Sequence, residues 1–210
     1  MNYIENIFVC LAAPLFIAIL CMRGKGRRMM IFLLAGMTVC LLSSYISSFL
    51  AIVHGADLIT AAIELSPFVE ELMKLFPVMF FLLVFEPEIK DTSDACLMTA
   101  IGFATFENVC FLMQNGAESL LRLAIRGLGT GVMHVVCAYI IAGGLIKLWD
   151  RAWLRMAGTV ALLAVAITYH GIYNILVSQT GAVAFVGYFI PLFTAAFGLI
   201  LRKVQSSIKK

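Results

Sequence analysis

Residues 66–85 read SPFVEELMKLFPVMFFLLVF, an apolar stretch interrupted by Glu70, Glu71 and Lys74. The stretch is long enough to cross the hydrocarbon core of a bilayer as a helix. Insertion scales place the cost of one charged side chain near the centre of such a helix at about 2.5–3.5 kcal/mol. Glu70 and Lys74 are four residues apart on one helical face, so an ion pair can offset part of this cost. The remaining cost predicts polar partners on other helices or a water-filled cavity.

The composition of the whole chain is that of a membrane protein. Of its 210 residues, 62% are hydrophobic and 13% are charged, whereas soluble domains average about 45–50% apolar and about 25% charged residues. The formal net charge of +3 is too small for a nucleic-acid-binding surface. Stretches long and apolar enough to span a bilayer lie at about 4–22, 29–53, 66–85, 95–114, 128–148, 154–177 and 182–201. We therefore predict an all-α, polytopic bundle of about seven transmembrane helices, one domain over residues 1–210, in the cell (inner or plasma) membrane.

Two shorter segments, 56–65 and 117–127, do not span. In the second segment Glu118, Arg122 and Arg126 recur at four-residue spacing opposite leucine and isoleucine residues. This pattern is typical of a helix lying on the membrane surface. We therefore expect one or two interfacial helices, with both arginines facing solvent or lipid headgroups.

The distribution of basic residues predicts the orientation. Lysine and arginine residues gather in the segments 23–28, 147–155 and 202–210, which fall on one side if seven helices alternate in direction. Short basic loops face the cytoplasm. The N-terminus is then predicted outside and the C-terminus in the cytoplasm, and the acidic loop 86–94 also lies on the cytoplasmic side.

Polar residues interrupt three later apolar stretches as well. Glu107 and Asn108 lie in the fourth stretch and His134 in the fifth. His170 and Asn174 lie four residues apart in the sixth, hence on one helical face.

These residues reach similar depths. With a rise of 1.5 Å per residue, Glu70, Glu71 and Asn174 lie roughly 5 Å, and Glu107, His134 and His170 roughly 10 Å, below the outer ends of their helices. Because the helices run in alternating directions, the agreement is not a consequence of spacing alone. We predict that these side chains line one cavity in the outer half of the membrane.

Each polar residue alone has a structural explanation: an interhelical hydrogen bond for a histidine or an asparagine, and a structural ion pair for Glu70 and Lys74. Together they can do chemistry. A carboxylate near histidine activates water as a general base, and Asn or His side chains can stabilise an oxyanion. Glutamate and histidine are also ligands of first-row metals, so metal-free and metal-assisted hydrolysis both remain open. Buried Glu, His and Lys also form proton relays, so a transporter or proton-coupled channel is the alternative.

Four motifs in order resemble those of the PrsW-type intramembrane proteases, distant relatives of the CAAX prenyl endopeptidases and bacteriocin-processing proteins. The motifs are Glu70-Glu71-x-x-Lys74, Phe103-x-x-x-Glu107-Asn108, the isolated His134 and His170-x-x-x-Asn174. The resemblance covers about residues 66–175. It implies a bacterial membrane protease that makes the first, extracytoplasmic cut in a membrane-anchored protein, an anti-sigma factor in known members.

The resemblance also implies roles. Glu70 or Glu71 would activate water, Glu107 and His134 would orient the water or bind metal, and His170 with Asn174 would stabilise the oxyanion, with Lys74 and Asn108 in support. The enzyme would need no cofactor, or a divalent metal such as zinc held by Glu71, Glu107, His134 and His170. Two departures stand out. Glu107 occupies the place of a histidine in the CAAX endopeptidases, and Phe111 stands where many PrsW-like sequences are expected to have tyrosine.

The assignment of Glu70 and Glu71 is open on sequence grounds. In an isolated helix the better partner of Lys74 is Glu70, which would leave Glu71 free. The resemblance to the CAAX endopeptidases implies the opposite, with the first glutamate catalytic and the second paired. We take Glu70 as the base and Glu71 as the partner of Lys74.

Overall fold

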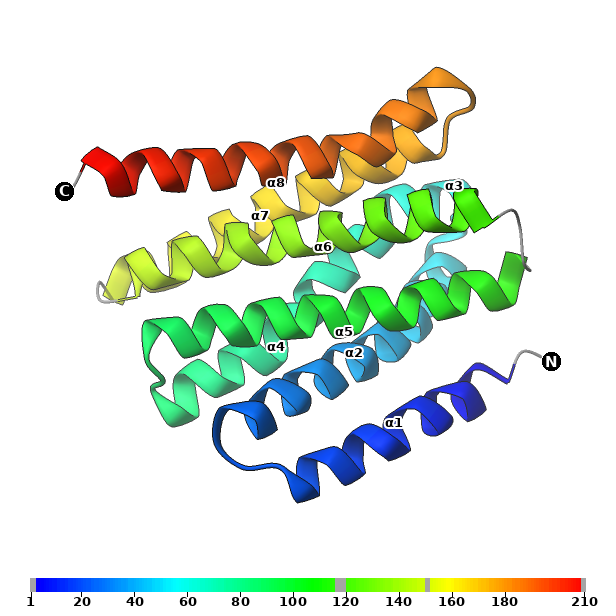
Figure 1. Cartoon of the computed structure of the whole chain (residues 1–210). Helices are drawn as coiled ribbons and strands as arrows, with labels where there is room; N and C mark the ends of the chain where they lie inside the picture. Colours follow the sequence, from blue (N-terminus) through cyan, green and yellow to red (C-terminus); the bar gives the residue numbers. More distant parts are fainter. Residues whose placement is uncertain (1–2, 116–119, 150–151, 209–210) are drawn as a thin grey trace.

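A computed structural model describes residues 3–115, 120–149 and 152–208, and within these ranges the chain is helical, with no strand. The elements are α1 (Ile4–Cys21), α2 (Gly24–His54), α3 (Leu58–Thr60), the π-helix η1 (Ala61–Leu65), α4 (Ser66–Phe85), α5 (Ile89–Asn115), α6 (Leu120–Leu148), α7 (Ala152–Val177) and α8 (Ala182–Ile208) (Figure 1). The all-α prediction is confirmed.

The long helices lie roughly parallel to one another in a bundle (Figure 1). Helix α1 lies at the edge and packs on α2, which packs against both α4 and α5. Helix α6 packs against α5, α7 and α8, while α4 also contacts α7. Helix α4 therefore has neighbours on several sides, and its charged residues can meet side chains of other helices.

Six described helices are long and apolar enough to cross a membrane, so the chain is a multi-pass membrane protein. They are α1, α2, α5, α6, α7 and α8. The remaining predicted span, 66–85, coincides with the 20-residue helix α4. Helix α4 differs from the six by the three charged residues Glu70, Glu71 and Lys74 in its apolar stretch.

The prediction of a separate surface helix over 117–127 is wrong for its described part. Residues 120–127 form the first turns of α6, which continues without a break to Leu148; residues 117–119 lie outside the described ranges. The physical reason lies in Arg126, whose side chain turns inward to bind Asn108 of α5. By contrast, residues 58–65 form α3 and η1, which run directly into α4.

Helices α2 and α5 meet through glycine. A Cβ atom on Gly36 would lie 2.1 Å from the carbonyl oxygen of Thr99, and one on Gly102 would lie 2.0 Å from that of Leu33. Only glycine permits this close approach of two helix backbones. In both helices this contact lies on the N-terminal side of the residues that border a large cavity.

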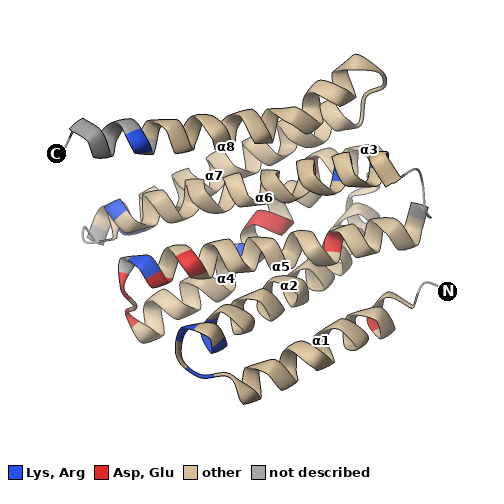
Figure 2. Ribbon diagram, viewed as in Figure 1, with Lys and Arg blue, Asp and Glu red and all other residues tan. Residues whose placement is uncertain are grey.

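The two helices are also joined at their starts by ion pairs. Lys25 Nζ lies 2.5 Å from Asp94 Oδ2, and Arg28 Nη2 lies 2.8 Å from Asp91 Oδ1. These pairs account for acidic residues at the end of the bundle where basic residues gather. Figure 2 shows Lys and Arg at the start of α2, the end of α6 and the C-terminal part of α8, all at that end. The assignment of this end to the cytoplasm stays a prediction.

Candidate active site

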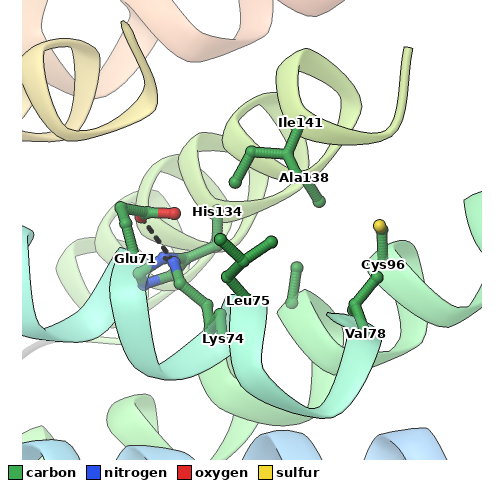
Figure 3. Close-up of a pocket in the computed structure, with 9 residues that line it drawn as sticks. Glu71, Lys74, Leu75, Val78, Cys96, His134, Ala138 and Ile141 are labelled. Carbon is green, nitrogen blue, oxygen red and sulfur yellow. Dashed lines mark hydrogen bonds and ion pairs between the residues drawn. The ribbon is translucent and has the colours of Figure 1, made fainter. Parts of the chain in front are cut away.

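Polar side chains from four helices meet inside the bundle. Figure 3 shows Glu71 and Lys74 of α4 facing His134 of α6, among apolar side chains. The exposed fractions are 1% for Glu71, 6% for Lys74 and 0% for His134. Charged groups this deeply buried are stable only when they are paired and hydrogen-bonded.

Glu71 accepts two hydrogen bonds on one oxygen. Lys74 Nζ lies 2.6 Å from Glu71 Oε1, and Nδ1 of His170 on α7 lies 2.8 Å from the same oxygen. A carboxylate can only accept, so His170 Nδ1 carries the proton. The neutral ring then presents the lone pair of Nε2 to the site, in the tautomer that a carboxylate partner sets.

The expectation from an isolated helix, that Lys74 pairs with Glu70, is wrong, because the pair is formed with Glu71 at i, i+3. The reason is the rotation of α4 in the bundle. Glu71 and Lys74 face α6 and α7, where His134 and His170 offer hydrogen bonds. Glu70 instead borders the cavity between α2, α4 and α5.

His134 joins Lys74 to Glu107. Lys74 Nζ lies 2.8 Å from His134 Nδ1, and His134 Nε2 lies 2.7 Å from Glu107 Oε2. Because an ammonium group only donates, Nδ1 accepts and Nε2–H donates to Glu107. One chain of hydrogen bonds therefore runs from Glu71 through Lys74 and His134 to Glu107.

Glu70 is the carboxylate with an unused oxygen. Its Oε2 is buried and has no hydrogen-bond partner among the described residues. The same atom lies 3.7 Å from His170 Nε2. The rings of His134 and His170 are edge to face, with centroids 5.1 Å apart. Glu70 therefore faces the two histidines with a free acceptor.

The donor atoms of Glu70, His134 and His170 lie within 4.8 Å of one another and could hold a metal ion. One carboxylate and two imidazoles form a ligand set known from catalytic zinc sites. The free Glu70 Oε2 and the orientation of His170 by Glu71 fit such an ion, since metal-binding imidazoles are commonly held by a carboxylate. In the neutral His134 ring Nδ1 accepts from Lys74 and Nε2–H donates to Glu107, so His134 would have to release one of these two partners to bind an ion. Two of the expected ligands, Glu71 and Glu107, are outside this group of three. Glu107 is hydrogen-bonded to His134, which is a member of the group.

Arg126 is a site residue that sequence reasoning missed. Its Nη1 donates to Asn108 Oδ1 at 2.6 Å, and its Nη2 lies 3.5 Å from Glu107 Oε1. Its guanidinium carbon lies 3.5 Å from the centre of the Phe111 ring, so the phenylalanine at the expected tyrosine position supports a cation–π contact. The available signal was spacing: Arg126 precedes His134 by eight residues, which places both on one face of α6.

Asn174 makes its described hydrogen bond away from the glutamates and histidines. Its Nδ2 donates to the carbonyl oxygen of Ala62 in η1 at 2.9 Å. Asn174 thus stabilises the segment that leads into Glu70 and Glu71.

A cavity of about 750 Å³ borders the cluster. Glu70, Glu107 and Arg126 line its inner part, and Gly55 and Ala56 line it at the end of α2. The carboxylates of Glu70 and Glu107 are therefore reachable from a space large enough for a substrate segment.

The sequence matches the family model of the PrsW family intramembrane metalloproteases over residues 25–200. No curated protein and no solved structure matches the chain. The matched range contains all four motifs and all the side chains of the cluster described above.

Proposed function

The chain belongs to the PrsW family of intramembrane metalloproteases, and on that premise we propose that Glu70 activates the water that hydrolyses a peptide bond of its substrate. The family membership makes the chain a membrane protease rather than the transporter that its buried charges also allowed. Its substrate is a membrane protein, and its surroundings are lipid.

The single observation that carries the assignment is the buried, unpartnered Oε2 of Glu70 at the border of the large cavity. Glu71 accepts from Lys74 and His170, and Glu107 accepts from His134. Of these three carboxylates, Glu70 is the one with a buried oxygen that no described residue hydrogen-bonds, and this oxygen can take the proton of a water molecule. The water oxygen would attack the carbonyl carbon, Glu70 would take the proton, and the proton would pass to the leaving amine nitrogen as the C–N bond breaks.

We propose that one oxygen of Glu70, together with His134 and His170, holds the metal that the family name implies, and that the other Glu70 oxygen takes the proton from water. A bound divalent ion such as zinc would supply Lewis acidity and a lowered pKa of water. Glu71 then acts as a positioning residue, since it holds the His170 ring with Nε2 toward Glu70. Lys74 balances the charge of Glu71 and, without a metal, also donates to His134 Nδ1.

Arg126 is our candidate for stabilising the oxyanion. It borders the cavity, and its hydrogen bond to Asn108 and its contact with Glu107 leave further N–H donors. His170 donates through Nδ1 to Glu71, and Asn174 donates to Ala62, so neither is as well placed for this role as the motif resemblance implied. A fixed donor aimed at developing charge is commonly worth about 10²–10³ in rate.

The substrate we propose is a single-span protein cut at its extracytoplasmic flank, such as an anti-sigma factor. The substrate class rests on the resemblance of the four motifs to PrsW-type proteases. The side of cleavage rests on the cavity, which reaches the C-terminal end of α2, opposite the basic segments.

The test is reconstitution of the purified protein in liposomes with candidate single-span substrates, with and without a chelator. Glu70→Gln and Glu71→Gln belong in the same assay. Cleavage that the chelator stops, that zinc restores and that Glu70→Gln abolishes supports the proposal. Unchanged cleavage in both variants contradicts the mechanism.

A further inference from the structure

The large cavity has the length of an extended peptide. Along α2 its lining runs from Cys40 to Gly55, which at 1.5 Å per residue is about 22 Å. An extended chain rises about 3.3 Å per residue, so about seven residues fit along this wall. We name this space, between α2, η1, the start of α4 and α5, the α2 cleft.

The wall formed by α2 is made of small side chains. They are Cys40, Ser44, Ser47, Ser48 and Ala51, with Ile52 as the one large side chain that α2 contributes, and η1 adds Ala61 and Ala62. Small side chains let another backbone approach a helix closely. The α2 wall is therefore suited to contact a main chain rather than to enclose one large side chain.

Ser47 has an unused polar atom in this wall. It is 8% exposed, and its Oγ has no hydrogen-bond partner among the described residues. Two neighbouring serines differ, because Ser43 Oγ donates to Val39 O at 2.6 Å and Ser48 Oγ donates to Ser44 O at 2.8 Å. A buried hydroxyl without a protein partner is uncommon, and a bound ligand or water is one way to satisfy it.

The cleft leads to the proposed base. Glu70 lines the cleft, and its Oε2 is the second buried side-chain atom there without a hydrogen bond. Across the cleft α5 presents Glu107 and Gln114, with Phe103 and Phe111. Carboxylates and an amide along the lining suit a polypeptide backbone and disfavour a lipid acyl chain.

We propose that the α2 cleft binds about seven residues of the substrate in extended form, with the Ser47 hydroxyl hydrogen-bonded to the substrate main chain. This inference rests on the proposed proteolysis, because the segment bound is the one delivered to Glu70. Main-chain recognition through Ser47 and a small-residue wall tolerates varied substrate sequences, provided that the segment is unwound.

The experiment measures binding and cleavage separately. The probe is a fluorescent single-span protein whose extracytoplasmic flank is a flexible segment of Gly, Ser and Ala. Binding is measured in the Glu70→Gln background, so that no cleavage intervenes, and cleavage is measured in the native background. The variants are Ser47→Ala, which removes the hydroxyl, and Ser44→Phe and Ala51→Phe, which fill the cleft. Ser43→Ala is the matched control, since Ser43 lies on the same helix but outside the cleft lining.

We expect the filled variants to weaken binding at least tenfold and Ser47→Ala to weaken it about three- to tenfold, with a matching rise in KM and little change in kcat. Ser43→Ala should bind as the parent does. The proposal is overturned if Ser44→Phe and Ala51→Phe bind the probe as the parent does, or if the parent does not bind the probe. It is also overturned if these variants lose binding of a fluorescent phospholipid and keep binding of the probe. Because Ser47→Ala is nearly isosteric, it stays informative if a filled variant misfolds. If the filled variants cleave the probe with an unchanged KM, the binding role of the α2 cleft is refuted and the proposed proteolysis is not. If the native protein binds the probe without cleaving it, the proposed proteolysis is refuted and the binding role of the cleft is not.

Discussion

Glu70 Oε2 lies 3.7 Å from His170 Nε2, while Nδ1 of the same ring is hydrogen-bonded to the neighbouring Glu71. Two consecutive glutamates thus contact opposite nitrogens of one imidazole. Successive residues of a helix point about 100° apart, so α4 can direct one carboxylate to the cavity and the other to α7. This arrangement gives the two glutamates separate roles, one free to react and one holding the ring.

Replacement of Glu71 tests the structural role. Glu71→Gln leaves the Lys74 ammonium without its anionic partner in a site where Lys74 is only 6% exposed. Breaking a buried ion pair on one side costs about 3–5 kcal/mol. We expect a marked loss of thermal stability in detergent, measured by the unfolding midpoint.

A double variant provides the control for this cost. Glu71→Leu with Lys74→Met removes both charges, so the double variant should be more stable than either single variant. A double variant whose loss of stability equals the sum of the single losses would show that the pair contributes nothing as a pair.

Replacement of Arg126 tests a site residue that the amphipathic sequence pattern did not reveal. Arg126→Ala removes the contacts with Glu107 and Asn108 and should lower kcat by about 10²–10³, with a smaller change in KM. Arg126→Lys should not restore kcat, because a lysine cannot donate to Asn108 and stack on Phe111 in the same planar geometry. Lys90→Ala, at the other end of α5, is the charge control and should leave kcat unchanged. Full recovery by Arg126→Lys would reduce the role of Arg126 to its charge.

The metal prediction is checked by measuring the metal content of the protein rather than its cleavage rate. Purified protein should contain about one zinc or comparable divalent ion per chain, measured by elemental analysis. His170→Ala removes one of the three donors and should lower the metal content severalfold. Full cleavage by protein shown to be metal-free would contradict the metal site while leaving Glu70 as the base.

The orientation is tested with reporter fusions placed after residue 25 and after residue 210. Both should report the cytoplasm, because the basic segments 23–28 and 202–210 are predicted to lie there. Reports from opposite sides would mean that the predicted number of membrane-spanning helices is wrong.

The features that follow from helix geometry were predictable, and those that depend on helix rotation were not. The common depth of Glu107, His134 and His170 follows from a fixed rise per residue, and it agrees with the contacts that join these side chains. The partner of Lys74 was not predictable from α4 alone. The choice of Glu71 depends on imidazoles that α6 and α7 bring to it.

Two misses also depend on how the helices are rotated in the bundle. The spacing of Arg122 and Arg126 beside leucines is equally compatible with a surface helix and with the end of a transmembrane helix. The contact of Arg126 with Asn108 of α5 distinguishes the two, and the sequence does not show it. The free hydroxyl of Ser47 could not be foreseen either. A serine in a transmembrane helix commonly bonds to the carbonyl four residues earlier, as Ser43 and Ser48 do.

The most direct measurement compares Glu70→Gln with Glu71→Gln in the same proteoliposome cleavage assay, with the unfolding midpoint recorded for each protein. Our account predicts that Glu70→Gln is folded, binds substrate and loses at least about 100-fold in turnover, the share expected of a general base. It predicts that Glu71→Gln loses stability together with activity. Near-normal turnover by Glu70→Gln, with activity abolished in a stably folded Glu71→Gln, would contradict the assignment of Glu70 as the base.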